Sequence, residues 1–230
     1  MNSVRIGNFT SSRIWALMST NRKGDDFGAP ALTYIKSKKW EKRLGRTLDI
    51  ESGSKACAWG TLLEKRAFDL MPSFDSALQS QETLAHPTIA GWYGSPDYID
   101  KDLVGDIKCP WTLNAFCELV DSIETGSPAL AENHKEYYWQ LVSNAIITGK
   151  KFAELTVYCP FQDELETIRE MARSQDEYQQ RYTFINFALD SDLPYLVNGC
   201  GYQNMYQLRF EVPEADKEAL TSAVQRAITY

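Results

Sequence analysis

The chain has 230 residues, which is enough for one domain of ordinary size with a substantial core. Its formal charge of −7 at pH 7 argues against a general nucleic-acid coat protein, which is normally basic, but not against an enzyme whose acidic side chains bind metal. No apolar run approaches the roughly 18 residues of a membrane span, so we expect no membrane association and a cytoplasmic location. Five scattered cysteines without a Cys-x-x-Cys pair favour reduced thiols over a zinc or iron–sulfur site.

The first part of the chain predicts three helices separated by a loop. Thr10-Ser11-Ser12 is a plausible N-cap for a short helix over 10–19. Residues 20–30 are rich in glycine, asparagine and aspartate and are typical of a loop. Longer helices are expected over about 31–44 and about 54–70, the latter because its apolar residues recur at helical spacing.

The helix expected over 31–44 carries most of a basic segment with an aromatic residue inside it. Its cations are Lys36, Lys38, Lys39, Lys42, Arg43 and Arg46. Lys38 and Lys39 could follow the phosphates of DNA while Trp40 stacks on a base. Alternatively, the segment is a solvated helix face on which Trp40 and Leu44 pack inward at i, i+4 spacing. The sequence leaves both interpretations open.

The rest of the chain alternates strands and helices, which predicts an α/β (α+β) fold with a mixed central sheet flanked by helices. Strands are expected over 81–84, 91–99, 103–109, 152–158 and 205–212. Helices are expected near 112–124, over 134–148, over about 162–181 with an extension after an interruption, and over 213–228, with a loop at Gly126-Ser127-Pro128.

Two acidic motifs on neighbouring segments suggest metal-assisted cleavage of a phosphodiester. Asp97 ends the first motif, Gly94-Ser95-Pro96-Asp97, and Asp106 and Lys108 lie in the second, Gly105-Asp106-Ile107-Lys108-Cys109-Pro110. On a strand, Asp106 and Lys108 share one face while Ile107 enters the core. The two aspartates could then bind one Mg²⁺, and Lys108 could orient a water or neutralise phosphate charge. The alternative is a surface hairpin that carries solvated charges.

Two helical residues could complete such a site. Glu64 precedes the acidic motifs and could reach over the sheet to supply a third carboxylate. Gln140 flanks an apolar seam in the helix over 134–148 and could hydrogen-bond a lysine or a phosphate oxygen. Taken separately, each of these side chains is of a kind that is usually solvated on a helix.

Together these motifs resemble the lambda-exonuclease-like, YqaJ-type viral recombinase family of the PD-(D/E)xK nuclease superfamily, with its restriction-endonuclease-like fold. The matching motifs are Lys55-Ala56-Cys57-Ala58-Trp59-Gly60-x-x-x-Glu64, Ser95-Pro96-Asp97, Asp106-Ile107-Lys108-Cys109-Pro110, and the helix with Gln140 followed by Tyr158-Cys159-Pro160. The resemblance runs from about Arg5 to Pro160. It implies a single nuclease domain over 1–230, with a family-divergent, more helical segment at about 161–204. Asp106 stands where the lambda enzyme has glutamate.

The resemblance implies an Mg²⁺-dependent exonuclease, with Mn²⁺ as a possible substitute, that degrades linear double-stranded DNA from 5′ to 3′. It would leave 3′ overhangs for phage-type recombination in a host cytoplasm, with a single-strand annealing protein as a partner and a homotrimer as the assembly. Glu64, Asp97 and Asp106 would bind metal and Lys108 would assist the attacking water. Arg5 and Ser12, with Gln140, would bind the terminal 5′-phosphate.

Two other functions remain open at this point. One is a structure-specific endonuclease of the same superfamily. The other is a catalytically silent DNA-binding module that keeps the fold. The presence of Glu64, Asp97, Asp106 and Lys108 together argues against the silent module.

Overall fold

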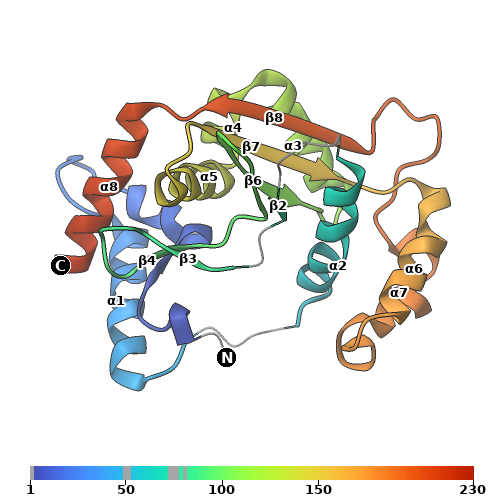
Figure 1. The fold of residues 1–230 in the computed structure, drawn as a ribbon, viewed down its shortest axis with the longest axis horizontal. Helices are drawn as coiled ribbons and strands as arrows, with labels where there is room; N and C mark the ends of the chain where they lie inside the picture. The colour runs from blue at the N-terminus through green and yellow to red at the C-terminus, as the bar shows by residue number, and fades with distance from the viewer. Residues whose placement is uncertain (1–2, 49–52, 72–77, 80–81) are drawn as a thin grey trace.

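The computed structural model describes residues 3–48, 53–71, 78–79 and 82–230, and its centre is a five-stranded mixed sheet (Figure 1). The strand order is β2 (Leu78–Gln79), β5 (Tyr98–Ile99), β6 (Leu103–Lys108), β7 (Phe152–Tyr158) and β8 (Met205–Glu211). β6 and β7 are parallel, and the other neighbours are antiparallel. The expected mixed sheet flanked by helices is therefore confirmed, and the expected bounds of β7 match.

A second, three-stranded sheet corrects the expected strand over 91–99. It contains β1 (Phe9–Thr10), β4 (Trp92–Gly94) and β3 (Leu84–Ala85), with β1 parallel and β3 antiparallel to β4. Ser95-Pro96-Asp97 separates β4 from β5, and these two strands belong to different sheets. The strand ends here because proline has no N–H to donate within a ladder. The strand expected over 81–84 begins only at Leu84, and residue 81 lies outside the described residues.

Helices cover both faces of the central sheet and form two apolar cores. The first core holds α1 (Ala29–Leu44), α3 (Leu113–Thr125), α4 (Ser127–Asn133), α5 (Lys135–Thr148) and α8 (Glu214–Thr229). The second holds α2 (Lys55–Leu70), α6 (Leu165–Arg173) and α7 (Thr183–Phe187). Along β6, Val104 packs in the first core and Ile107 in the second, as the alternation of strand side chains requires.

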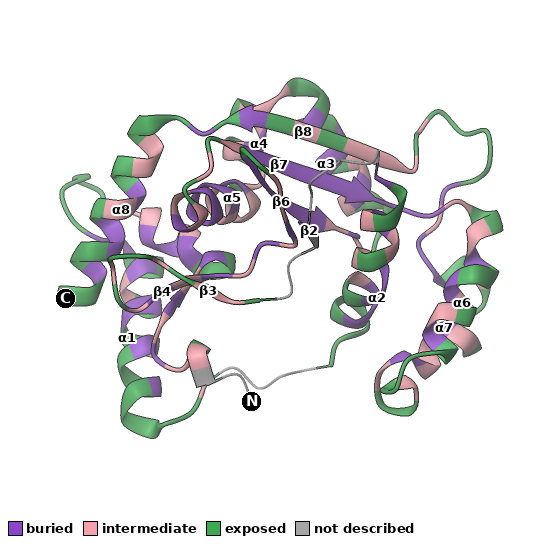
Figure 2. Cartoon of the chain, viewed as in Figure 1, coloured by how far each residue is buried: buried purple, intermediate pink, exposed green. Residues whose placement is uncertain are grey.

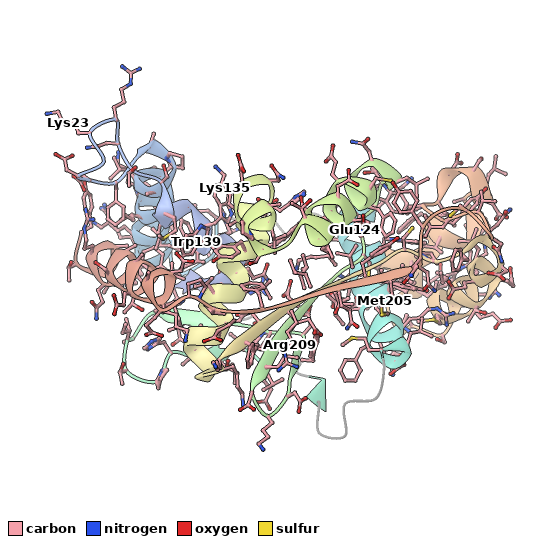
Figure 3. All side chains as sticks on the ribbon, turned by 90° about the horizontal axis from the view of Figure 1, so that it is seen from above. Lys23, Glu124, Lys135, Trp139, Met205 and Arg209 are labelled. Atoms are coloured by element: carbon pink, nitrogen blue, oxygen red, sulfur yellow. The ribbon has the colours of Figure 1, made fainter. Side chains whose placement is uncertain are left out.

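The figures show the same division. β6 and β7 are buried along most of their length, while the outer faces of α6 and α8 are exposed (Figure 2). Trp139 of α5 packs against the first core and Met205, at the start of β8, against the second (Figure 3). None of the helices in the described ranges is both long and apolar enough to span a bilayer.

Most helix bounds agree with the sequence within one or two residues, with two corrections. The loop expected at Gly126-Ser127-Pro128 is the start of α4, because proline fits the first turn of a helix and Gly126, at φ 112°, ends α3. The helix expected over 10–19 is a 3₁₀ helix, η2 (Ser11–Met18), and the Thr10 side chain makes no capping hydrogen bond.

The 161–204 segment is more broken than expected. The single helix predicted over about 162–181 is a 3₁₀ turn η3 (Gln162–Glu164), then α6, then a π-helix η4 (Tyr178–Tyr182) that leads directly into α7. A further 3₁₀ turn, η5 (Asp190–Asp192), precedes the return to β8. A π-turn holds one more residue than an α-turn, so it changes the direction in which the following side chains point.

Glu164 joins this segment to the rest of the molecule. Its Oε1 accepts hydrogen bonds from Arg66 Nη2 at 2.5 Å and from the Tyr158 hydroxyl at 3.0 Å, and its Oε2 accepts one from the Phe161 N–H at 2.7 Å. Burial raises the pKa of Glu164, but the Phe161 and Arg66 hydrogen bonds outweigh burial and hold the pKa below its usual value. One carboxylate therefore links α2, β7 and the start of η3.

We expect Glu164→Gln to lower the free energy of unfolding by about 2 kcal/mol at pH 7, because Arg66 is left partly buried without its charge partner. Because the folded-state pKa of Glu164 is lowered, its contribution is present above the usual glutamate pKa of about 4.3 and is lost as the pH falls through the folded value. Urea unfolding at pH 7 and near pH 3 measures both effects, and the variants should converge in acid.

Glu166→Gln is the matched control. Glu166 pairs with Arg173 at 2.8 Å, but its side chain is 64% exposed. The control should change the free energy of unfolding by less than about 0.5 kcal/mol. Equal effects of the two substitutions would contradict the special position of Glu164.

Candidate active site

Asp106 is a buried carboxylate on the central strand β6. It is only 1% exposed, and its Oδ1 accepts a hydrogen bond of 2.7 Å from Nε2 of Gln140 on α5. Its Oδ2 forms an ion pair with Nζ of Lys108, without the geometry of an ordinary hydrogen bond. Asp106 and Lys108 therefore share a face of β6 and Ile107 packs in the second core, as the sequence predicted.

The turn before β5 places Asp97 next to β6. The Asp97 N–H donates to the carbonyl of Gly105 at 3.0 Å, and its Oδ2 accepts from the Ile107 N–H at 2.6 Å. Tyr98 then crosses directly over Gly105, where a Cβ atom would lie 1.8 Å from the phenol ring. Only glycine permits this close approach, so Gly105 is needed to bring Asp97 alongside Asp106.

Glu64 approaches the same place from α2. Leu63 and Ala67 bury the apolar side of that helix, which leaves Glu64 half-buried at the edge of the core. Both Glu64 and Asp97 lie close enough to Asp106 and Lys108 for the charges of these two residues to shift their pKa values. The structure thus places Glu64, Asp97, Asp106, Lys108 and Gln140 at one end of the central sheet.

The buried charge of Asp106 raises the pKa values of both neighbouring acids, Asp97 and Glu64. Burial first, and then the Asp106 carboxylate, raises the pKa of Asp97 to about 8. Burial raises the pKa of Glu64, and Asp106 adds to this effect. Burial opposes the Lys108 ammonium, but Asp106 and Asp97 outweigh it and raise the pKa of Lys108. The cluster is therefore short of positive charge.

The donor set suits a hard divalent cation, although the side chains are not gathered around one. Carboxylate oxygens are the ligands that Mg²⁺ and Mn²⁺ prefer, and Glu64, Asp97 and Asp106 supply them from three elements. In the described ranges, however, no three His, Cys, Asp or Glu side chains stand close enough to hold a metal ion as they are. The ammonium of Lys108 is the cation that Asp106 contacts.

A buried polar cluster that the sequence analysis missed lies behind Gln140 on α5. Ser143 Oγ contacts Ser11 Oγ at 2.8 Å and accepts from Trp92 Nε1 at 2.8 Å. Asn144 is fully buried, and a Cβ atom on Gly94 would lie 2.4 Å from its Oδ1. The sequence signal for this cluster was a serine next to an asparagine in the apolar middle of a predicted helix. The cluster packs η2, β4 and α5 together on the side of α5 that leads to Gln140.

Arg5 and Ser12 lie in the N-terminal segment, which Glu41 fixes to α1. Oε2 of Glu41 accepts hydrogen bonds from the Gly7 N–H and from Lys38 Nζ, both at 2.9 Å. Gly7, at φ 68°, has no room for a Cβ atom, which would lie 2.2 Å from Lys42 Cγ. The side chains of Arg5 and Ser12 are exposed. The structure keeps both available to a ligand and shows no contact of either with Gln140.

The placement of the basic helix requires one correction. Lys38 is 6% exposed and paired with the buried Glu41, so it belongs to the core and not to a DNA-binding surface. Lys39 and Trp40 are exposed, and the Lys39 ammonium lies 5.6 Å from the Tyr230 ring. The alternative in which Trp40 and Leu44 pack inward is wrong, because they are 51% and 59% exposed.

We expect Asp97→Asn to stabilise the protein in EDTA at pH 8 by about 1–3 kcal/mol, because it removes a charge that the folded state disfavours. A carboxyl group whose folded-state pKa is raised stabilises the protein at low pH. That stability is lost as the pH rises from the usual 3.8 towards about 8. Thermal unfolding at pH 4 and pH 8 should show a difference only at the higher pH. Asp102→Asn, an exposed acid of the same hairpin, should show no difference at either pH.

No protein-family model and no curated protein matches the chain. Among solved structures, it is similar to the alkaline exonuclease LHK-Exo from Laribacter hongkongensis, with a TM-score of 0.63 and 19% identity over 98% of this chain and 88% of that one. LHK-Exo in complex with dAMP gives the same score and identity over 99% and 89%. A phage-related exonuclease from Haemophilus somnus 129PT gives a TM-score of 0.62 and 12% identity over 97% and 92%. The chain therefore has the mixed α+β fold of these exonucleases.

Proposed function

We propose that this protein is a divalent-metal-dependent deoxyribonuclease that acts as an exonuclease on the ends of linear double-stranded DNA. The observation that carries the proposal is the buried Asp106–Lys108 ion pair on β6, with Asp97 hydrogen-bonded to the intervening Ile107 N–H and Gln140 to Asp106. Glu64 on α2 lies close enough for the charges of Asp106 and Lys108 to act on it. The fold shared with two exonucleases supports the same assignment, and so does the binding of a deoxynucleoside monophosphate, dAMP, by one of them.

The reaction is hydrolysis of a phosphodiester, in which a water attacks phosphorus and the bond from phosphorus to the 3′-oxygen breaks. A divalent cation, when bound to Glu64, Asp97 and Asp106, would lower the pKa of water and offset the charge that develops on the phosphate. Lys108, beside Asp106, would donate to the attacking water or to a phosphate oxygen. Gln140 holds one oxygen of Asp106 and so fixes how that carboxylate is presented.

The N-terminal segment supports action from the 5′ end. Arg5 offers a planar fork of donors and Ser12 a short hydroxyl donor, both suited to a terminal phosphate. Ser11, next to Ser12, contacts Ser143 on α5, the helix that also carries Gln140. Lys39 and Trp40 provide an exposed cation and an aromatic face for the duplex or a displaced strand.

The finer parts of the proposal follow from the family resemblance of the motifs. They are membership in the YqaJ-type family, Mg²⁺ as the natural metal with Mn²⁺ as a substitute, 3′ overhangs that serve recombination, an annealing protein as a partner, and a homotrimer. A structure-specific endonuclease of the same superfamily would use the same acids. A silent DNA-binding module is the second candidate, favoured by the absence of a ready three-acid metal site in the described residues.

We expect the protein to shorten linear duplex DNA in Mg²⁺ or Mn²⁺ and to leave it intact in EDTA. End-labelled duplexes with a 5′-phosphate or a 5′-hydroxyl, and a closed circular duplex, distinguish the candidates on a sequencing gel. Lys108→Ala should lower the rate by at least about a hundredfold, because it removes the cation of the cluster. Stepwise loss from the 5′ end, with the circle untouched, is the expected result.

The other outcomes separate the alternatives. Cutting of the circle would make the protein an endonuclease. Equal binding of DNA with Mg²⁺ and EDTA, without loss of length, would identify the silent module.

We also expect Arg5→Ala to lower the rate on a 5′-phosphorylated end about tenfold while leaving the rate on a 5′-hydroxyl end unchanged, because only the charged end requires the guanidinium group. Arg22→Ala, which removes an exposed arginine from the loop before α1, is the matched control. Equal losses on both ends, or the same change in the control, would remove Arg5 from the 5′-phosphate site.

A further inference from the structure

Arg181 brings the 161–204 segment to the candidate active site. It lies in the π-helix η4, which packs against α2, the helix that carries Glu64. Figure 1 shows α2 beside α6 and α7, at the opposite end of the molecule from α1 and α8. Sequence analysis treated this segment as divergent and assigned it no part in the site.

The contacts of Arg181 place its guanidinium group next to Glu64. Nη2 donates to Thr61 Oγ1 at 3.1 Å, and Thr61 precedes Glu64 by three residues, which puts the two side chains on one face of α2. The charge of Arg181 lowers the pKa of Glu64, against the larger effect of burial. Only Arg181 and Lys108 act on Glu64 as cations among the described residues.

Aromatic packing fixes this part of the segment. Phe184 contacts Trp111 with ring centroids 5.7 Å apart, and Trp111 contacts Trp59 of α2 at 5.6 Å. Trp111 lies shortly after Lys108, the last residue of β6. Tyr182 is buried, and its ring lies 5.5 Å from the guanidinium carbon of Arg181. Arg181 is therefore held by a packed wall and not by a loose surface loop.

Arg181 retains donors for a ligand. The Arg181 side chain is 33% exposed. Its second side-chain hydrogen bond goes to Oε2 of Glu177 at 3.3 Å, and the Glu177 side chain is 66% exposed. Arginine has five N–H donors, and these two contacts use Nη1 and Nη2 once each. An ion pair this exposed contributes little and can be exchanged for a phosphate. Lys108, in contrast, is already engaged by Asp106.

We propose that Arg181 binds a backbone phosphate of the DNA strand next to Glu64, so that the 161–204 segment forms one wall of the nuclease site. The inference rests on the proposed function and deepens it by naming a substrate contact. Three carboxylates repel a polyanion, and an arginine placed beside them offsets that repulsion where the strand enters. Arg181 lies within a π-turn, a feature that recurs at functional sites, and contacts Thr61 of α2.

The test compares the wild-type protein with Arg181→Ala, Arg181→Lys and a matched control, Arg173→Ala. Arg173 lies in the same segment and bonds Glu166 and Asn186, at 2.8 and 2.7 Å, with a side chain 47% exposed. Anisotropy of a fluorescein-labelled, 5′-phosphorylated duplex in EDTA, over a series of salt concentrations, gives Kd and its salt dependence. Cleavage of the same duplex in Mg²⁺ gives kcat and KM, and thermal unfolding gives Tm.

For Arg181→Ala we expect Kd and KM to rise about five- to tenfold and the slope of log Kd against log salt to fall by about one. Arg181→Lys should keep the slope and recover part of the affinity, while Arg173→Ala should behave as the wild type. An unchanged Kd and slope in Arg181→Ala would overturn the inference, as would a loss confined to Tm and kcat.

The two proposals can fail separately in this design. Cleavage by the wild type together with an unchanged Arg181→Ala variant would overturn the Arg181 contact and leave the nuclease proposal standing. Binding without cleavage by the wild type would overturn the nuclease proposal, and the salt series in EDTA would still decide the phosphate contact.

Discussion

The buried pair of Asp106 and Lys108 is the constraint on which the rest of the candidate site depends. A carboxylate that is 1% exposed is costly unless it is paired and hydrogen-bonded, and the neighbouring elements are arranged to meet that condition. Gln140 on α5 donates a hydrogen bond to one oxygen, and Lys108 forms an ion pair with the other. Gly105 lets Tyr98 cross the strand so closely that Asp97 reaches the Ile107 N–H, one residue from Asp106. The central position of Asp106 in the sheet therefore fixes where the neighbouring side chains lie, and it also buries the acidic groups close together.

That charge problem links function to stability. Three acids around one engaged lysine raise the pKa of Asp97 and Glu64 because burial and mutual repulsion both disfavour their charged forms. A fold selected only for stability would replace one of these acids by a neutral residue. Retaining them makes sense if a cation joins the cluster during function, since the same repulsion that destabilises the folded protein then favours binding of the cation.

The sequence predicted the local features well and the long-range contacts poorly. Period-two alternation around Ile107 was enough to place Asp106 and Lys108 on one face, and β7 was predicted with its observed bounds. The break at Pro96 was missed because the sequence of 91–99 does not show that its two halves join different sheets. Lys38 was misplaced because its burial depends on Glu41 also binding the Gly7 N–H, thirty-four residues away. Ser143 and Asn144 were missed because their partners come from η2 and β4.

The 161–204 segment shows why divergence in sequence does not mean distance from the site. Glu164 anchors its beginning to Arg66 on α2, and the Phe184–Trp111 contact anchors its middle to the chain just after β6. The first anchor lies on α2, which carries Glu64, and the second lies just after β6, which carries Asp106 and Lys108. A segment attached at these points cannot shift without disturbing the elements that carry the acid cluster. Arg181 lies between the two anchors, so its position is set by the same packing that supports the site.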